Sequence, residues 1–452
     1  MRTATAPPAS AASEAASAAA NLPAFAAWWR CLLIGPAQAS VVVLTLAMIA
    51  LAEMGLRAMG IQTLTTILAT IVATMIASGS LQLGAWLIGI ALGRGAANAL
   101  RLAYFQTLLI GLGVTGVIAL LSLLCGRLLN LEPHATLVFT AIIVVLTPLL
   151  LAVGELMLLQ RRAQTIGTLA VAAGGAWTAT LAYAAPPLVT VSSFTLIATI
   201  ALVVQAEFEI RRRSWAMGKR LRRLPPPSLI WLHAAPFVWY GILTVTLVFA
   251  GQPALWLSDD ILSRGYLYLI HLAGLSLFIL SQGAFEAAMA LLWFIGTTVQ
   301  HQFTLPQDSL AGRSIQNFIL AAKRRAVLVQ VLLASVIGPL IFWWLASRTD
   351  GVSWGSIGLT LAGSMVSYAL LGHALFLCGV LNVFGNRWRV VKALLLTVIV
   401  TGTIAQLALV YLGPLASVAG IGIGSLLLYR LVVGELRRLL HDSAYTLYRS
   451  FS

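Results

Sequence analysis

The sequence predicts an all-α polytopic membrane protein with about twelve transmembrane helices in two six-helix bundles. Of its 452 residues, 60% are hydrophobic and only 9% are charged, whereas a soluble globular domain carries about 25% charged residues. This composition excludes a cytosolic enzyme, a disordered chain and a secreted disulfide scaffold. Only helices or closed barrels satisfy their backbone groups in lipid, and the alternation typical of a barrel is absent from this sequence.

Long apolar runs between charged or Pro/Gly breaks define the predicted helices, because a helix needs about 20 apolar residues to cross the hydrocarbon core. The first six runs cover residues 32–54, 61–93, 102–125, 135–159, 164–183 and 188–206. The second six cover residues 228–250, 266–298, 326–346, 355–381, 390–411 and 414–433. The run after Arg30 is too long for the apolar region of a cleaved signal peptide, so we expect it to remain as the first membrane helix.

The placement of the cations predicts the orientation of these helices. If both termini are cytoplasmic, 24 of the 28 lysines and arginines fall on the inner side, as the positive-inside rule requires. One miscounted helix would invert every later loop and destroy this asymmetry. The net charge of +15 is therefore interpreted as a topological signal that favours membrane lipids, and not nucleic acid, as the partner.

A strongly basic segment divides the chain into two halves. We expect a mobile Ala/Ser/Pro-rich cytoplasmic tail at 1–30, an N-terminal bundle at 31–210, a basic cytoplasmic linker at 211–227, a C-terminal bundle at 228–435 and a cytoplasmic tail at 436–452. The linker is interpreted as a solvated loop beside anionic lipid, with docking of a cytosolic protein as the alternative.

The two halves contain matching breaks. The second and eighth apolar runs are each 33 residues long and are interrupted by Ser78-Gly79-Ser80 and Ser281-Gln282-Gly283. Such paired breaks predict a transport pathway where the halves meet, although small residues in membrane helices also permit close packing. The candidate pathway residues, which include a cation that could meet an anionic substrate, are Gly35, Pro36, Gly79, Gln82, Arg94, Trp239, Tyr240, Gln282, Gly283 and Glu286.

Ionisable groups inside membrane helices are candidates for function. Glu155 and Glu286 lie about 30 Å from the predicted outer ends of their helices, where each either reaches the membrane surface, pairs with an arginine, or serves the inner mouth of a cavity. His373 and Arg430 also fall in the inner third. The middle of the bilayer is therefore expected to be free of charge, and no proton relay is predicted.

Aromatic residues near mid-depth could stack against sugar faces, although membrane aromatics more often serve packing. They are Trp177, Trp239, Tyr240 and Tyr368. Trp239 and Tyr240 are the better candidates because they lie on the run that carries Pro236.

Enzyme signatures are missing from the sequence. The cysteines at 31, 125 and 378 show no metal spacing, and no phosphate-binding glycine loop is present. We therefore expect no catalytic residues, no cofactor and no metal. A membrane acyltransferase using His373 and Asn382 is kept as an alternative.

Several stretches resemble the PelG family of exopolysaccharide transporters, within the multidrug/oligosaccharidyl-lipid/polysaccharide exporter superfamily. They are Ile34-Gly35-Pro36, Ser78-Gly79-Ser80-Leu81-Gln82, Glu286, Asn386-Arg387-Trp388-Arg389 and Glu435-Leu436-Arg437-Arg438-Leu439. The resemblance implies a transporter in a bacterial inner membrane that exports an exopolysaccharide or flips a lipid-linked glycan. It also implies a cytosolic glycosyltransferase and inner-membrane synthase subunits as partners.

In the predicted mechanism, helices one, two, seven and eight enclose a central cavity, and bends at Gly79 and Gly283 let the bundles open alternately or pass a polymer. A small-solute carrier of the major facilitator type has the same six-plus-six organisation, but the 94–101 loop lacks the charge pattern of that family. A non-transporting subunit of a polysaccharide synthase complex is the remaining alternative.

Overall fold

The computed structural model describes residues 40–45, 47–51, 63–93, 97–128, 132–159, 161–217, 227–251, 270–271, 273–280, 308–347, 354–383, 387–412 and 415–441. Every regular element in these residues is a helix. Nine helices in the described ranges are long and apolar enough to cross a membrane. These observations agree with the all-α membrane fold predicted from composition.

The N-terminal half contains a short helical segment at Ser40–Leu51 followed by five long helices. These are α3 (Thr63–Gly93), α4 (Ala97–Leu128), α5 (Pro133–Leu158), α6 (Arg162–Tyr183) and α7 (Pro187–Met217). Pro133 and Pro187 are the first residues of their helices, where a proline costs no backbone hydrogen bond.

The C-terminal half begins with α8 (Pro227–Phe249) and continues with helical residues at 270–271 and 273–280. The remaining helices are α11 (Asp308–Ala346), α12 (Trp354–Val383), α13 (Arg387–Leu412) and α14 (Ala416–His441). Each half therefore shows six helical segments within the described ranges, as the apolar runs predict.

Several helices extend beyond the apolar runs that predict them. Helix α7 continues to Met217, so that Arg211, Arg212 and Arg213 lie on its last turns and not in a linker. Helix α11 begins at Asp308, well before the apolar run at 326–346, and α14 ends at His441 within the predicted tail. The physical reason is that hydropathy marks where a helix leaves the lipid, whereas the helical backbone continues into the polar layer.

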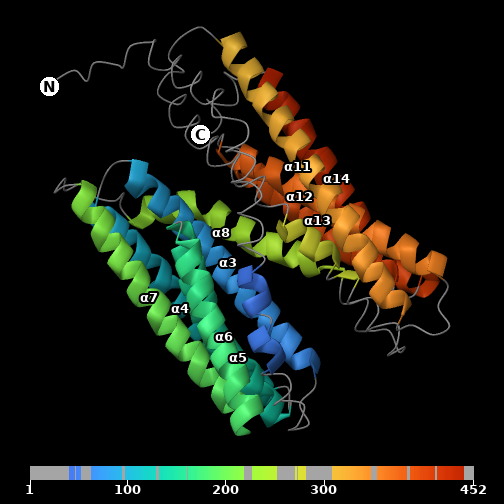
Figure 1. Ribbon diagram of the computed structural model, residues 1–452. Helices are drawn as coiled ribbons and strands as arrows, with labels where there is room; N and C mark the ends of the chain where they lie inside the picture. The colour runs from blue at the N-terminus through green and yellow to red at the C-terminus, as the bar shows by residue number, and fades with distance from the viewer. Residues whose placement is uncertain are drawn as a thin grey trace, which may run out of the picture.

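The two halves form separate bundles that lie side by side, with α3 and α8 between them (Figure 1). Among the described residues, three clusters of buried apolar side chains lie in the N-terminal bundle, and the first of these also includes Ala234 and Phe237 of α8. Two further clusters lie in the C-terminal bundle. Large apolar side chains on the outside of both bundles are exposed, among them Leu109, Val171, Leu340 and Leu407. In a membrane-spanning chain this outer surface faces lipid.

The bundles join where α3 crosses α8. Among the described helices, every other extensive helix pair lies within one half. At the crossing, a Cβ atom added to Gly241 would lie 2.5 Å from the carbonyl oxygen of Ser78, and one added to Gly79 would lie 3.0 Å from the side chain of Ile242. The Ser78 hydroxyl donates a hydrogen bond to the carbonyl oxygen of Gly241 over 3.1 Å. Small residues here let the two backbones approach closely, as in other packed membrane helices.

Aromatic packing extends this crossing. Trp86 of α3 stacks on Phe237 of α8 with ring centroids 5.9 Å apart. The guanidinium of Arg387, at the start of α13, lies 4.7 Å from the centroid of the Phe237 ring. We call the contact of Ser78, Gly79 and Trp86 with Phe237 and Gly241 the α3–α8 joint.

We predict that Gly241→Leu destabilises the protein by about 1–3 kcal/mol, because the new side chain would collide with the α3 backbone. Gly116→Leu is the matched control, since a Cβ at Gly116 meets nothing within 4 Å. Thermal unfolding of the detergent-purified variants measures the difference. Equal melting temperatures for the two variants would contradict the close crossing.

Candidate functional site

Four of the predicted pathway residues lie in described positions. Gly79 and Gln82 are on α3, and Trp239 and Tyr240 are on α8. Gly35, Pro36, Arg94, Gln282, Gly283 and Glu286 lie outside the residues whose side chains the structure describes. The break at Ser281-Gln282-Gly283 is among them, so its relation to the break at Gly79 stays a prediction.

The described pathway residues do not share one surface. Gly79 and Gln82 pack against α8 at the α3–α8 joint, where the Gln82 side chain lies beside Gly241. Tyr240 instead faces α12, and its hydroxyl approaches the carbonyl oxygen of Leu375 at 3.5 Å. Trp239 is 48% exposed. In this conformation the break at Gly79 serves close packing between the halves, which is the alternative that the sequence left open.

A cavity of about 230 Å³ lies within the N-terminal bundle. It is lined by the 40–51 segment, α3, α5 and α7 and is partly open. Its lining is mainly apolar, including Met48, Ile142, Val145, Leu149 and Val191. None of its described lining residues is charged. The cavity therefore suits an uncharged or apolar group, because a bare ion would lose its hydration without compensation.

Five hydroxyl groups supply the polar part of this lining: Thr45, Thr66, Thr70, Ser192 and Thr195. The hydroxyls of Thr45 and Thr70 donate to the helix carbonyls of Val41 and Thr66, each over 2.8 Å. The Thr66 hydroxyl is buried and has no hydrogen-bond partner among the described residues. Sequence reasoning missed this cavity, because scattered threonines in apolar runs give no signal until the helices are packed.

Two aromatic residues considered for sugar stacking serve packing instead. The Trp177 indole donates to the carbonyl oxygen of Ala47 over 3.2 Å, which ties α6 to the 40–51 segment. Tyr368 is buried inside the C-terminal bundle. The Tyr368 ring is therefore covered by its own bundle, whereas Trp177 is half-buried.

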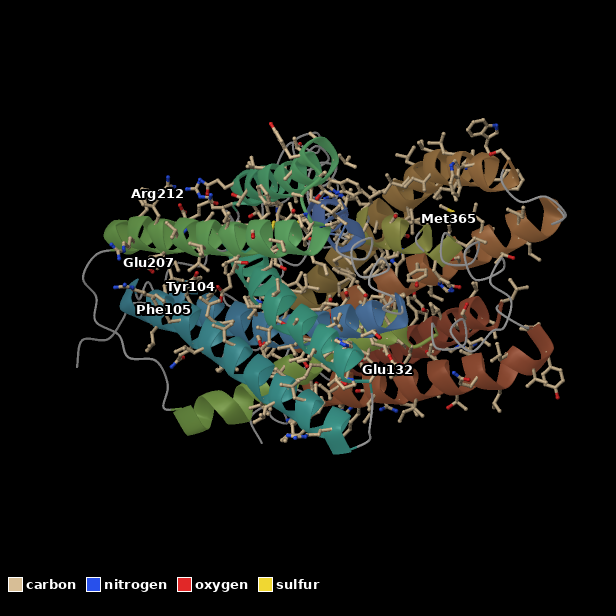
Figure 2. The ribbon with its side chains drawn as sticks, turned by 90° about the horizontal axis from the view of Figure 1, so that it is seen from below. Tyr104, Phe105, Glu132, Glu207, Arg212 and Met365 are labelled. Carbon is tan, nitrogen blue, oxygen red and sulfur yellow. The ribbon has the colours of Figure 1, made fainter. Side chains whose placement is uncertain are left out.

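Five arginines bind two glutamates at one end of the N-terminal bundle. Glu209 of α7 pairs with Arg161, Arg212 and Arg213, and Glu207 pairs with Arg101 and Arg211. Figure 2 shows Glu207 and Arg212 at the same end of the bundle as Tyr104 and Phe105. These ion pairs fasten α4 and the start of α6 to α7, and they leave an excess of positive charge at the predicted cytoplasmic end.

Two of the three alternatives that the sequence left for Glu155, surface access and an arginine partner, are wrong, and a role at the inner mouth of a cavity stays a prediction. The Glu155 side chain neither reaches a surface nor pairs with an arginine among the described residues, since it is 0% exposed and neither carboxyl oxygen has a partner there. The error came from depth alone: the residue lies near the end of α5, but the surrounding helices cover it completely.

The C-terminal bundle contains buried polar groups that hydropathy did not reveal. His271 bonds through Nδ1 to the Tyr368 hydroxyl at 3.3 Å and through Nε2 to the Ser417 hydroxyl at 2.7 Å. His271 escaped notice because it is one polar residue in a long apolar run. His373, the histidine that the acyltransferase alternative uses, forms a hydrogen bond with Gln330 over 2.9 Å. This contact between α12 and α11 gives His373 a structural role.

The comparisons with known proteins identify the fold. No protein-family model and no curated protein sequence matches the chain. Solved structures do match, including a MATE transporter in the bent conformation, with a TM-score of 0.65 and 12% identity over 94% of this chain and 97% of that one. The match to the eukaryotic MATE transporter AtDTX14 has a TM-score of 0.60 and 15% identity over 94% of this chain and 99% of that one.

A MOP superfamily transporter from Pyrococcus furiosus gives a TM-score of 0.63 and 11% identity, over 92% of this chain and 96% of that one. The chain thus has the fold of MATE transporters. The predicted all-helical, two-bundle architecture of the exporter superfamily is confirmed at the level of the fold.

We predict that Thr195→Phe fills the cavity and abolishes its ligand binding, whereas Val204→Phe, on the exposed face of the same helix, leaves binding intact. A hydrophobic fluorescent probe whose emission rises in apolar cavities measures the difference in detergent-purified protein. Equal probe binding by the two variants would show that the cavity is not the binding site.

Proposed function

We propose that this protein is a transporter of a bacterial inner membrane that exports an exopolysaccharide or flips a lipid-linked glycan. The observation that carries the proposal is the MATE transporter fold over nearly the whole chain. The cation pattern supports a multi-pass orientation with both termini in the cytoplasm. A cytosolic glycosyltransferase and inner-membrane synthase subunits are the partners that the same proposal implies.

The chemistry of the cavity supports an amphiphilic substrate. Its lining is apolar and uncharged, with five hydroxyls, and this favours a lipid chain or a neutral sugar over a cationic solute. Arginines gather at the predicted cytoplasmic end of the same bundle. The combination fits a lipid-linked glycan, whose diphosphate is anionic and whose lipid is apolar.

The α3–α8 joint supplies the place where the bundles would move. A close crossing of two helices through small residues allows a change of crossing angle with little rearrangement of side chains. Pro236 lies one turn before Gly241 in α8, and Pro148 lies inside α5. Each proline removes one backbone hydrogen bond and makes its helix easier to bend.

The proposal is tested with purified protein in liposomes that contain a polyprenyl-diphosphate glycan with a fluorescent sugar. Movement of the glycan between leaflets is measured by quenching from the outside. The wild type and Gly116→Leu are expected to move the glycan, whereas Gly79→Leu is expected to fall to the level of protein-free liposomes because the joint cannot close.

Size-exclusion chromatography checks that the Gly79→Leu protein is folded. If the leucine prevents folding, the Gly79→Ala variant is used as a milder change. A wild-type protein that moves the glycan no faster than protein-free liposomes would overturn the proposal. Uptake of a small water-soluble solute by the same liposomes would favour the major-facilitator-type alternative.

A further inference from the structure

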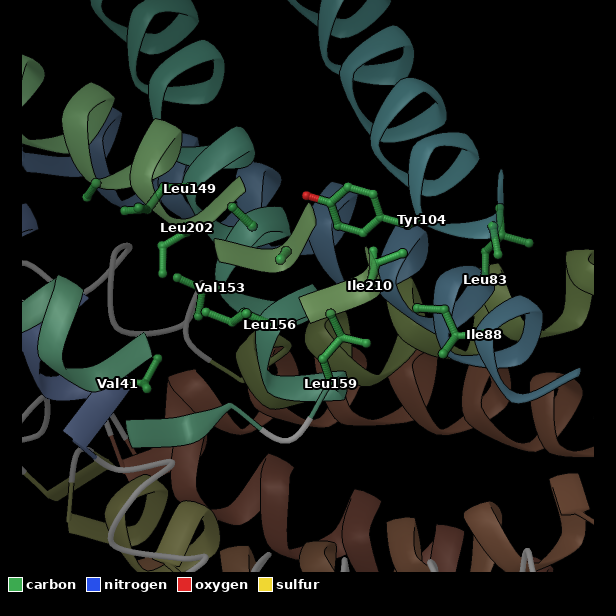
Figure 3. Packing of buried hydrophobic residues seen from close by; sticks show 14 of the residues in the cluster. Val41, Leu83, Ile88, Tyr104, Leu149, Val153, Leu156, Leu159, Leu202 and Ile210 are labelled. Atoms are coloured by element: carbon green, nitrogen blue, oxygen red, sulfur yellow. The ribbon is translucent and has the colours of Figure 1, made fainter. Parts of the chain in front are cut away.

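The most unusual polar group in the described residues is the carboxyl of Glu155. It is fully buried, and neither of its oxygens has a hydrogen-bond partner among those residues. Its sequence neighbours Val153 and Leu156 belong to the buried apolar cluster that also contains Leu159, Leu202 and Ile210 (Figure 3). A charged carboxylate in this setting would lose its hydration without gaining a cation or a donor. The packing seen here therefore accommodates the neutral acid.

The helices around α5 provide no counter-charge. Helix α3 contains no titratable residue. From α4, Tyr104 lies within electrostatic range of Glu155, but its hydroxyl points to the carbonyl oxygen of Val203 at 3.5 Å. From α7, Glu207 and Glu209 are the acids of this end, and they pair with Arg101, Arg161, Arg211, Arg212 and Arg213. The cation on α6 is its first residue, Arg162.

Glu155 lies on the helix that both lines the cavity and packs against α3. Leu149, six residues earlier on α5, lines the cavity, which places the carboxyl about 9 Å farther along the helix axis. Pro148, the residue before Leu149, removes one backbone hydrogen bond from the stretch of α5 that lines the cavity. The residue before Glu155, Gly154, is covered by the side chain of Leu81, since an added Cβ would lie 2.2 Å from its Cδ1.

Leu81 belongs to the same stretch of α3 as Ser78 and Gly79, whose other side contacts Gly241 of α8. A displacement of α5 at Glu155 is thus transmitted to the joint through two direct contacts. Ionisation of Glu155 would require water or a cation to reach it, and α5 would have to move away from its neighbours.

We propose that Glu155 is a proton-binding site of the N-terminal bundle, neutral when α5 packs as observed and ionised only when α5 separates from α3. Protonation joins one proton to one carboxylate and needs no other reactant. A metal cation is disfavoured, because it requires several ligands and the described residues contain no group of three or more His, Cys, Asp or Glu side chains that could hold one. The claim that Glu155 binds a proton is supported by the packing alone. The claim that this proton drives transport also depends on the proposed function.

Infrared difference spectroscopy tests proton binding without any substrate. The C=O stretch of a neutral carboxylic acid is expected in the wild type at neutral pH and is expected to be lost in Glu155→Gln. Glu132→Gln, at the exposed start of α5 (Figure 2), is the matched control and keeps the band. If Glu155→Gln fails to fold, Glu155→Asp keeps a titratable carboxyl and should give a shifted band.

An unchanged neutral-acid band in Glu155→Gln would mean that Glu155 is ionised in the wild type, and the proposal would be wrong. Loss of the wild-type band on adding sodium chloride, but not choline chloride, at constant pH would assign the site to a metal cation and would also overturn it. Neither result depends on glycan transport, so this test can fail independently of the proposed function.

Coupling to the joint is tested with spin labels at Phe208 of α7 and Arg430 of α14, both exposed, in a background without the native cysteines. The distance between the labels is expected to change between acidic and alkaline pH in the wild type, and to stay at its acidic value in Glu155→Gln. A pH-dependent change of equal size in Glu155→Gln would show that another group controls the bundles.

Discussion

The close approach of α3 and α8 is the constraint on which the arrangement of the two bundles depends. Most buried apolar residues cluster within one half or the other. The halves are held together mainly at α3 and α8, where Ser78 and Gly79 meet Gly241 and where Ala234 and Phe237 of α8 join the N-terminal cluster. In lipid such a contact gains little from the hydrophobic effect and depends on close van der Waals packing. It is therefore specific in geometry yet modest in strength, which suits a joint that must move.

The polar groups of the N-terminal bundle divide into two kinds with different physical consequences. The glutamates of α7 are matched by arginines, and these pairs hold helix ends together where the chain leaves the membrane. Glu155 is unmatched, although it lies on a neighbouring helix near the same end. Matched pairs stabilise one arrangement, whereas an unmatched buried acid makes the packing depend on whether a proton is bound.

The cavity, Glu155 and the α3–α8 joint are connected by two helices: α5 lines the cavity and carries Glu155, and α3 packs on α5 and forms the joint. Threonine and serine hydroxyls line the cavity, Pro148 lies in the stretch of α5 beside it, and Leu81 of α3 contacts α5 next to Glu155. A ligand in the cavity and a proton on Glu155 would therefore act on the same two helices. Coupling between two sites requires a shared element with two arrangements, and α5 packed on α3 is the element that both sites contact.

The sequence by itself determined the class of the fold, because too few charges and twelve apolar runs leave no alternative to a helical membrane protein. It also located the break at Ser78-Gly79-Ser80, since small polar residues stand out in a long apolar helix. The sequence could not predict that Gly79 packs against α8 near Gly241 or that Glu155 is fully buried. It also could not predict that His271 forms hydrogen bonds with Tyr368 and Ser417. Hydropathy indicates how deep a residue lies along one helix, but not which neighbouring helix covers each face. The tertiary structure decided those points, because only helix packing determines whether a polar group meets a partner, lipid or an apolar wall.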